Sequence, residues 1–445
     1  MTANPREQVL AATVGRDRVT DFVKSAALLL VVIGHSLAWF VRPDGSLDNT
    51  LNHAPQLWWL TWALQILPLF FFIAGAGMVR LAGERAAGRY LSRAAGLMEP
   101  AVLLFVFAFV ASCVLHATAP VSLQRNLGVL MVQLTWFLGG YMLYIALAPV
   151  LLRMSGYAGI VSMLAVIAGV DWLRLHVSAS LGWLNMLLVW AFFTTIGTRK
   201  DALRRSPAWL RLLGLGLAAA AAALLIAYGP YSKALITATG LPGISNLAPP
   251  TLVLACAGVA QILALTLVWP ALQRWLHSDR VWVPVAIFGS RAMQVYLYHM
   301  LVLVVVVLPF IARRSVTQPL SVAWWGQHAL VFVVTLSVVM LAAPALRRAS
   351  RALASAVLVR PWPAGMRRRL ARMSRGQARA LAATSGVLLL VQSTTGIGDF
   401  LAQRAVVGAP VYPLVTWALL MLCISLQLLA ARVQAGDALS ERVGQ

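Results

Sequence analysis

The chain has 445 residues, of which 60% are hydrophobic and only 11% are charged. This composition excludes an ordinary soluble globular protein, in which about 25% of residues are charged. The net charge of +23 comes from arginines that lie between apolar runs rather than on a separable basic domain, so it does not indicate nucleic-acid binding. Because the apolar runs have the length of a helix that crosses a bilayer, the sequence predicts an all-α, polytopic membrane protein.

The apolar runs predict a bundle of ten membrane-spanning helices, followed by a C-terminal helical hairpin. In chain order the ten runs cover residues 20–41, 57–79, 97–116, 128–152, 158–175, 181–198, 208–228, 250–272, 283–311 and 323–346. The hairpin is predicted from two weaker runs, 381–397 and 411–431. We therefore expect a transmembrane domain over 1–346, a basic linker over 347–380, and the hairpin with a short tail over 381–445.

Arginine is concentrated in the connections that follow the even-numbered spans. The richest of these connections is 347–380, which contains RRASR and MRRRLARMSR. Lys and Arg are enriched in cytoplasmic loops, so both termini are predicted to be cytoplasmic, in a multi-pass protein of the inner or plasma membrane. The cysteines Cys113, Cys256 and Cys423 lie far apart in apolar runs, and no metal site is expected.

The first span places two ionisable residues on one face of a helix. Lys24 and His35 are eleven residues apart, which is about three helical turns and about 16 Å. Lys24 is expected near the cytoplasmic surface, and His35 beyond the middle of the bilayer. An ionisable group at that depth is costly unless it faces a bundle interior or a wet cavity. His35 can serve as a general base for a hydroxyl group, or it can be a neutral histidine that is hydrogen-bonded to a neighbouring helix.

Four motifs in the same order resemble the acyltransferase 3 family of membrane enzymes, which move acyl groups from cytoplasmic acyl-CoA to glycans or other acceptors. The motifs are Asp21, Lys24 and His35 at the spacing of the family's first span; LPLFFFIAGAGM at 67–78; TWFLGGYMLYIALAPVLLR at 135–153; and FGSRAMQVYLYHMLV at 288–302. Together they extend over most of the predicted transmembrane domain.

This resemblance implies roles for individual residues. His35 would be the catalytic base, and the charged groups of Lys24, Arg93 and Arg89 would bind the phosphates of acyl-CoA. The arginines are equally well explained as topology signals. Asp21 belongs to the first motif, where it would orient the helix or substrate.

Two further assignments follow from the same resemblance. A carboxylate after the first span would orient the catalytic histidine, and Asp44 and Asp48 are the available residues. Either can instead be a solvated turn residue in RPDGSLDN. His299 would contact substrate or support the catalytic helix, although a core histidine bonded to its neighbours explains it as well.

The chain also departs from the family pattern at several positions. Lys24 stands in place of the usual arginine, which keeps the charge but loses the bidentate guanidinium group. Ala74 replaces a frequent serine, and Ala and Gly occupy the place where a second arginine is expected near Arg93. Arg291 and Met293 replace small residues in the last motif. The chain is thus predicted to be a divergent member.

The expected activity is O-acyl transfer, with acetyl-CoA as the default donor and no metal. The acceptor would be a hydroxyl group of a cell-envelope glycan, a glycolipid or another small or lipid-linked molecule. The alternative is a transporter or flippase of a polar or lipid-linked solute that kept the bundle and lost catalysis. A scaffold protein is a third alternative, but it would not need polar residues such as His35 inside the bundle.

Overall fold

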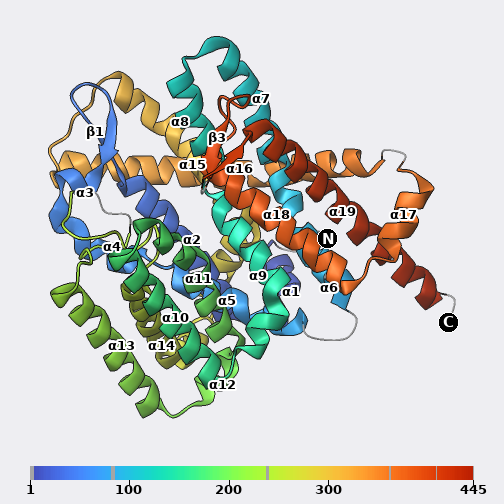
Figure 1. The fold of residues 1–445 in the computed structure, drawn as a ribbon, viewed down its shortest axis with the longest axis horizontal. Helices are drawn as coiled ribbons and strands as arrows, with labels where there is room; N and C mark the ends of the chain where they lie inside the picture. The colour runs from blue at the N-terminus through green and yellow to red at the C-terminus, as the bar shows by residue number, and fades with distance from the viewer. Residues whose placement is uncertain (1–4, 82–85, 237–239, 360–361, 407, 444–445) are drawn as a thin grey trace. The chain divides into compact units, whose positions relative to one another are not determined.

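The computed structural model describes the whole chain except residues 1–4, 82–85, 237–239, 360–361, 407 and 444–445 (Figure 1). Most of the described residues are helical. Eleven helical segments among them are long and apolar enough to cross a membrane: Arg18–Leu37, Pro55–Ala76, Ala87–Thr118, Thr135–Arg153, Tyr157–His176, Ala179–Thr198, Ala208–Tyr228, Leu252–Trp275, Asp279–Ala312, Val322–Ala356 and Pro413–Ala435. The predicted all-α polytopic class is therefore confirmed.

The chain divides into two compact units. The first unit comprises residues 1–79, 151–292 and 302–340, and the second comprises 80–150, 293–301 and 341–445. Helix α15 (Asp279–Ala312) contributes to both units, as does α16 (Val322–Val359).

The first unit contains the N-terminal helices and the middle of the chain. Its helices are α1 (Pro5–Ala12), α2 (Arg18–Leu37), α3 (Thr50–His53), α4 (Leu60–Leu64), α5 (Leu67–Ala76), α10 (Tyr157–His176), α11 (Asn185–Thr198), α12 (Lys200–Arg205), α13 (Ala208–Tyr228) and α14 (Leu252–Trp275), with parts of α15 and α16. Strands β1 (Trp39–Val41) and β2 (Leu47–Asn49) form an antiparallel hairpin directly after α2. Asp17 caps α2 by accepting a hydrogen bond from the Thr20 amide at 3.1 Å.

The second predicted span is not one continuous helix. A short 3-10 helix, Pro55–Trp59, leads into α4, and α5 begins only after Gln65 and Ile66. Pro68 lies in the first turn of α5, where its missing amide hydrogen is not needed and its ring restricts the residue before it. The apolar run therefore contains a break that its composition does not reveal.

The second unit contains the helices of residues 80–150 and the C-terminal hairpin. They are α6 (Ala86–Met98), α7 (Val102–Thr118), α8 (Val121–Val132), α9 (Thr135–Arg153), α17 (Ala364–Ala371), α18 (Arg375–Thr395) and α19 (Pro413–Val443). Strands β3 (Arg404–Val406) and β4 (Ala409–Val411) connect α18 to α19. Helices α18 and α19 pack against each other and against α6.

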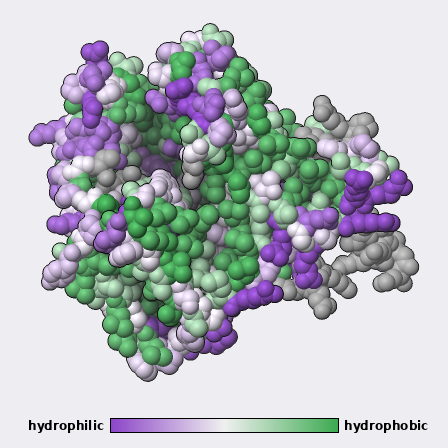
Figure 2. Space-filling view, in the orientation of Figure 1, coloured by the Kyte–Doolittle hydropathy of each residue, from purple (hydrophilic) through white to green (hydrophobic). Residues whose placement is uncertain are grey.

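Most of the described part of 347–380 is helical. Helix α16 continues to Val359, α17 follows, and α18 already begins at Arg375. A capping box between Ser374 and Gln377 defines that start. Helix α18 is more polar than the eleven apolar segments because it contains two arginines and the run Gln392–Thr395. Figure 2 shows hydrophobic side chains over wide areas of the helices, with hydrophilic side chains at the β1–β2 hairpin and at α17.

Candidate functional site

The start of α2 forms a small network of charges in the first unit. The Asp21 carboxylate lies 2.7 Å from the Arg16 side chain and 3.8 Å from the Lys24 ammonium group. Asp21 is largely buried, whereas the Lys24 side chain is half-exposed. Lys24 thus retains access to solvent while Asp21 fixes the first turns of α2, as expected for an anchor at a membrane surface.

His35 lies in the last turn of the same continuous helix, α2. Its side chain is half-buried, and its carbonyl oxygen accepts a hydrogen bond from the Ala38 amide at 3.3 Å. A cavity of about 40 Å³ adjoins this turn and is lined by Gly34 and Leu37 of α2 together with residues of α3 and α4. This cavity is too small for a CoA thioester, although its volume suits a single water molecule.

The LPLFFFIAGAGM motif forms α5, which packs against α2 and very closely against α11. A methyl group on Gly75 would overlap the backbone of Thr194, and one on Gly197 would overlap the backbone of Phe72. Ala74, the departure from serine, is buried at 5% exposure. Small residues that let two helices approach are the usual basis of helix packing in membranes.

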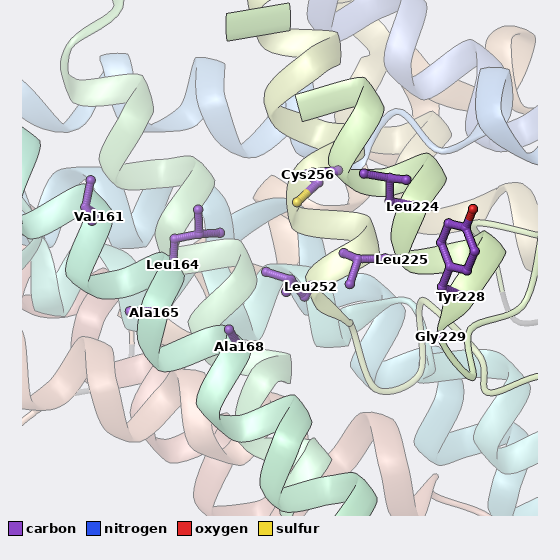
Figure 3. Close-up of a pocket in the computed structure, with 11 residues that line it drawn as sticks. Val161, Leu164, Ala165, Ala168, Leu224, Leu225, Tyr228, Gly229, Leu252 and Cys256 are labelled. Carbon is purple, nitrogen blue, oxygen red and sulfur yellow. The ribbon is translucent and has the colours of Figure 1, made fainter. Parts of the chain in front are cut away.

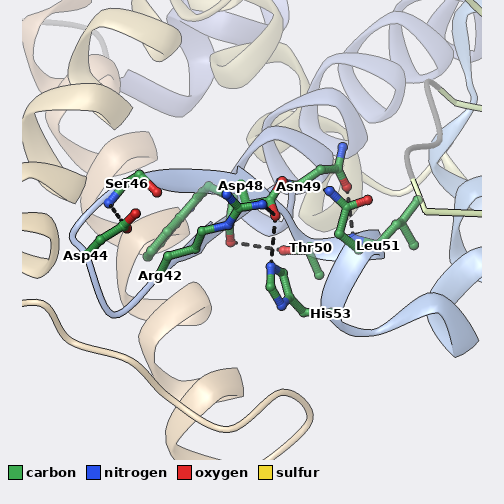
Figure 4. Close-up of polar contacts among 10 residues, drawn as sticks. Arg42, Asp44, Ser46, Asp48, Asn49, Thr50, Leu51 and His53 are labelled. Carbon is green, nitrogen blue, oxygen red and sulfur yellow. Dashed lines mark hydrogen bonds and ion pairs between the residues drawn. The ribbon is translucent and has the colours of Figure 1, made fainter.

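Asp48 is the centre of a polar cluster on the hairpin that follows α2 (Figure 4). One carboxylate oxygen accepts from the Asn49 amide and the Asn52 side chain, both at 2.7 Å. The other pairs with Arg42 and with His53 Nε2, the latter at 3.0 Å. Partial desolvation acts to raise the pKa of Asp48, but these four bonds outweigh it and hold the pKa at about 2.

Asp44 lies at the exposed tip of the same hairpin. Its carboxylate accepts a hydrogen bond from the Ser46 amide at 2.8 Å, and hydrogen bonding with Ser46 lowers the pKa of Asp44. Gly45 adopts a φ of +84°, which glycine tolerates without strain. Both aspartates thus form contacts within their own loop, and the expectation that either one orients His35 stays a prediction.

Sequence reasoning missed two histidines that support this hairpin. His53 stacks on Phe40 with ring centroids 3.9 Å apart, and His328 stacks on Trp39 at 4.7 Å. The His328 Nε2 also lies 3.1 Å from the Trp39 carbonyl oxygen. The only local signal was the proximity of His53 to Asp48, whereas the contact of His328 depends on the tertiary fold.

Arg93 is held in the second unit by an aromatic side chain of α9. Its Nε donates to the Tyr141 hydroxyl at 3.2 Å, its terminal nitrogen also bonds that hydroxyl, and its guanidinium carbon lies 5.6 Å from the centre of the ring. Arg89 is one turn earlier on α6 and is exposed. Residues four apart lie on one helix face, so the two arginines form a basic edge of α6.

His299 is fully buried in α15, within the second unit. Its Nδ1 lies 2.7 Å from the Val295 carbonyl oxygen, one turn back on the same helix. Near it, the Tyr296 hydroxyl donates to the Leu134 carbonyl at 2.6 Å, and its ring packs edge-on against Phe137. The third and fourth family motifs are therefore in direct contact, as the first and second are in the other unit.

A larger groove of about 790 Å³ lies between α10, α13 and α14 (Figure 3). Its lining is almost wholly apolar, with Leu164, Leu225 and Leu252 on its walls and Tyr228 at one end. Such a surface suits lipid chains rather than acid–base chemistry. Among the residues that the structure describes, no group of His, Cys, Asp or Glu side chains could hold a metal ion.

These features define a multi-pass α-helical membrane protein with polar residues at defined positions on its helices. Residues 20–344 match the family model of the acyltransferase 3 family, an acyltransferase domain, and this match covers more than half of the chain. The chain therefore belongs to the acyltransferase 3 family, as its motifs predict. No curated protein and no solved structure matches it.

Proposed function

We propose that the protein is an integral-membrane O-acyltransferase that uses cytoplasmic acyl-CoA, with acetyl-CoA as the default donor. The family match over residues 20–344 is the observation that carries this proposal. The acceptor would be a hydroxyl group of a cell-envelope glycan, a glycolipid or a similar molecule. With the two termini in the cytoplasm, the inner or plasma membrane would separate the pools of donor and acceptor.

In this reaction His35 is the general base. The acceptor hydroxyl gives its proton to the imidazole as its oxygen attacks the thioester carbonyl carbon. The carbon–sulfur bond then breaks, and CoA leaves as a thiolate that takes up a proton. The position of His35 on a helix within the membrane, where a histidine without a function is costly, supports this role.

The charged residues divide between donor binding and support. The positive charges of Lys24, Arg89 and Arg93 suit the phosphates of CoA, and Arg89 is exposed. Asp21 holds Lys24 at the start of α2, and His299 supports the helix that carries the last motif. For Asp48, the bonds to its own hairpin favour a role in holding the chain that leaves α2.

The test is transfer of labelled acetyl from acetyl-CoA into the glycan and lipid fractions of membranes that contain the protein. We expect label with the native protein, and a loss of about 10²-fold or more with His35→Ala. His176→Ala is the matched control, because His176 is exposed at the end of α10 and lies outside all four motifs. Equal transfer by His35→Ala and His176→Ala would refute the role of His35.

The alternative is a transporter or flippase that has lost catalysis. Lys24 and the missing second arginine near Arg93 are the observations that favour it. A transporter would move its solute without consuming acyl-CoA. Measurement of CoA release therefore separates the two functions.

A further inference from the structure

Residues 345–445, which we call the C-terminal extension, lie outside the acyltransferase match, which ends at residue 344. Within the second unit, however, its helices α18 and α19 pack directly against α6, the helix of Arg89 and Arg93. The extension is thus in contact with the helix to which the donor-binding arginines belong.

Two arginines of α18 repeat the spacing of the two arginines of α6. Arg375 and Arg379 are four residues apart, so they share one face of α18. The hydroxyl of Tyr90, which lies on α6, interacts electrostatically with Arg89, Arg375 and Arg379. Arg89 of α6 and both arginines of α18 therefore lie near Tyr90, while Arg93 lies one turn further along α6.

Helix α9 binds one arginine of each pair, Arg93 of α6 and Arg379 of α18. The Tyr141 hydroxyl binds Arg93, and the Ala146 carbonyl oxygen accepts from Arg379 Nε at 2.6 Å. Gly386 of α18 fixes the distance between these helices, because a methyl group there would lie 2.8 Å from the carbonyl oxygen of Gly139 on α9. The other two arginines, Arg89 and Arg375, are exposed. In this cluster of four arginines, α9 therefore fixes Arg93 and Arg379, and Arg89 and Arg375 are accessible to a ligand.

The charge of this cluster points to an anionic ligand. Arg89 and Arg93 on α6 and Arg375 and Arg379 on α18 place four guanidinium groups on two helices that pack together. Several guanidinium groups that gather near one point repel one another unless an anion neutralises them. Planar guanidinium groups bind phosphate oxygens in a bidentate manner, and CoA has a pyrophosphate and a 3′-phosphate to offer them.

We infer that Arg375 and Arg379 of the C-terminal extension complete the phosphate-binding site for acyl-CoA that begins with Arg89 and Arg93. This inference rests on the proposed function. It assigns a role to a helix outside the family match, and it supplies the positive charge that α6 lacks where a second arginine is expected. The two arginine-rich connections that the sequence predicts to be cytoplasmic thereby contribute to one site.

The experiment is equilibrium binding of labelled CoA to the full-length protein in phosphatidylcholine nanodiscs. CoA has no acyl group, so binding is measured without turnover. The double variant Arg375→Gln/Arg379→Gln is compared with Arg367→Gln/Arg368→Gln, which removes the same charge from exposed positions of α17. We expect a loss of affinity of about tenfold or more for the α18 variant and less than about twofold for the α17 variant.

Two further variants guard against a folding defect. Arg375→Gln alone changes an exposed side chain and should weaken binding while the protein still shows a cooperative melting transition. Arg375→Lys, which keeps the charge but loses the planar group, should bind CoA with intermediate affinity.

The outcomes separate the possible failures. If the native protein binds CoA and the α18 variant binds it equally tightly, this inference is wrong while the proposed function stands. If the native protein itself does not bind CoA, both fail. Anionic lipid headgroups offer the same phosphate chemistry, so the binding is repeated with phosphatidylglycerol in the discs. If only retention of phosphatidylglycerol depends on Arg375 and Arg379, the cluster is a lipid site and the inference is overturned.

Discussion

The close approach of α5 and α11 gives a sharp prediction for Gly75→Ala. The added methyl carbon would lie 2.8 Å from the Thr194 carbonyl carbon and 3.1 Å from the Gly197 Cα. Both neighbours are backbone atoms, so no side chain can rotate away and the two helices must separate. Overpacking of this kind costs about 1–3 kcal/mol, whereas alanine in place of glycine within a helix gains about 0.5–1 kcal/mol.

The matched control is Gly169→Ala. Gly169 lies in α10 of the same unit and has no atom within 4 Å of the position where its Cβ would be. The helical gain applies to both variants, so we expect them to differ by the overpacking cost of about 1–3 kcal/mol, with Gly75→Ala the less stable. At about 2–4 °C per kcal/mol, their melting temperatures should differ by about 2–12 °C.

The assay is thermal unfolding of purified protein in one detergent at one heating rate, because membrane proteins often unfold irreversibly. Gly75→Ala should unfold below the native protein, and Gly169→Ala at or above it. If Gly75→Ala is as stable as Gly169→Ala, the close packing of α5 against α11 that is described here is wrong.

Three further changes test the hairpin and the donor side. Asp48→Asn should lower the free energy of unfolding by about 1–2 kcal/mol above pH about 4. The folded pKa of Asp48, about 2, lies below its unfolded value, so this difference from the native protein should disappear as the pH falls toward 2. A difference in melting temperature that stays constant over this pH range would contradict the cluster. His328→Leu removes the bond that ties β1 to α16 and should speed amide hydrogen exchange in strands β1 and β2 several-fold, whereas unchanged exchange would show that His328 does not hold the hairpin. Tyr141→Phe removes the hydroxyl that holds Arg93 and should raise the Kd for CoA about threefold to tenfold; an unchanged Kd would show that this contact does not serve the donor.

The membrane helices could be predicted from the sequence because their apolar length is a property of each segment alone. Their ends and interruptions were harder, since they depend on local residues and on packing. Helix α16 continues to Val359, well beyond the apolar run, because RRASRALASAV contains good helix formers and no proline before Pro361. The break before α5 follows from Pro68, a signal that the apolar composition of the run concealed.

The candidate site was predictable only where its parts are close in sequence. Lys24 and His35 share one helix, so their spacing alone placed them on one continuous α2. The contact between Arg379 and Ala146 joins segments 233 residues apart, and no periodicity encodes it. The partners of Asp48 are within six residues, yet they depend on a hairpin whose strands have only three residues each.

The most direct test of the central claim is the release of CoA thiol by the purified protein reconstituted in liposomes with acetyl-CoA and a cell-envelope glycan or lipid extract as acceptor. We predict acceptor-dependent release in equal amount to the ester formed, with release by His35→Ala close to the background without protein. Ester formation without CoA release, or release that His35→Ala sustains at the native rate, would contradict catalysis by His35. Movement of solute across the liposome membrane with no CoA released would favour the transporter.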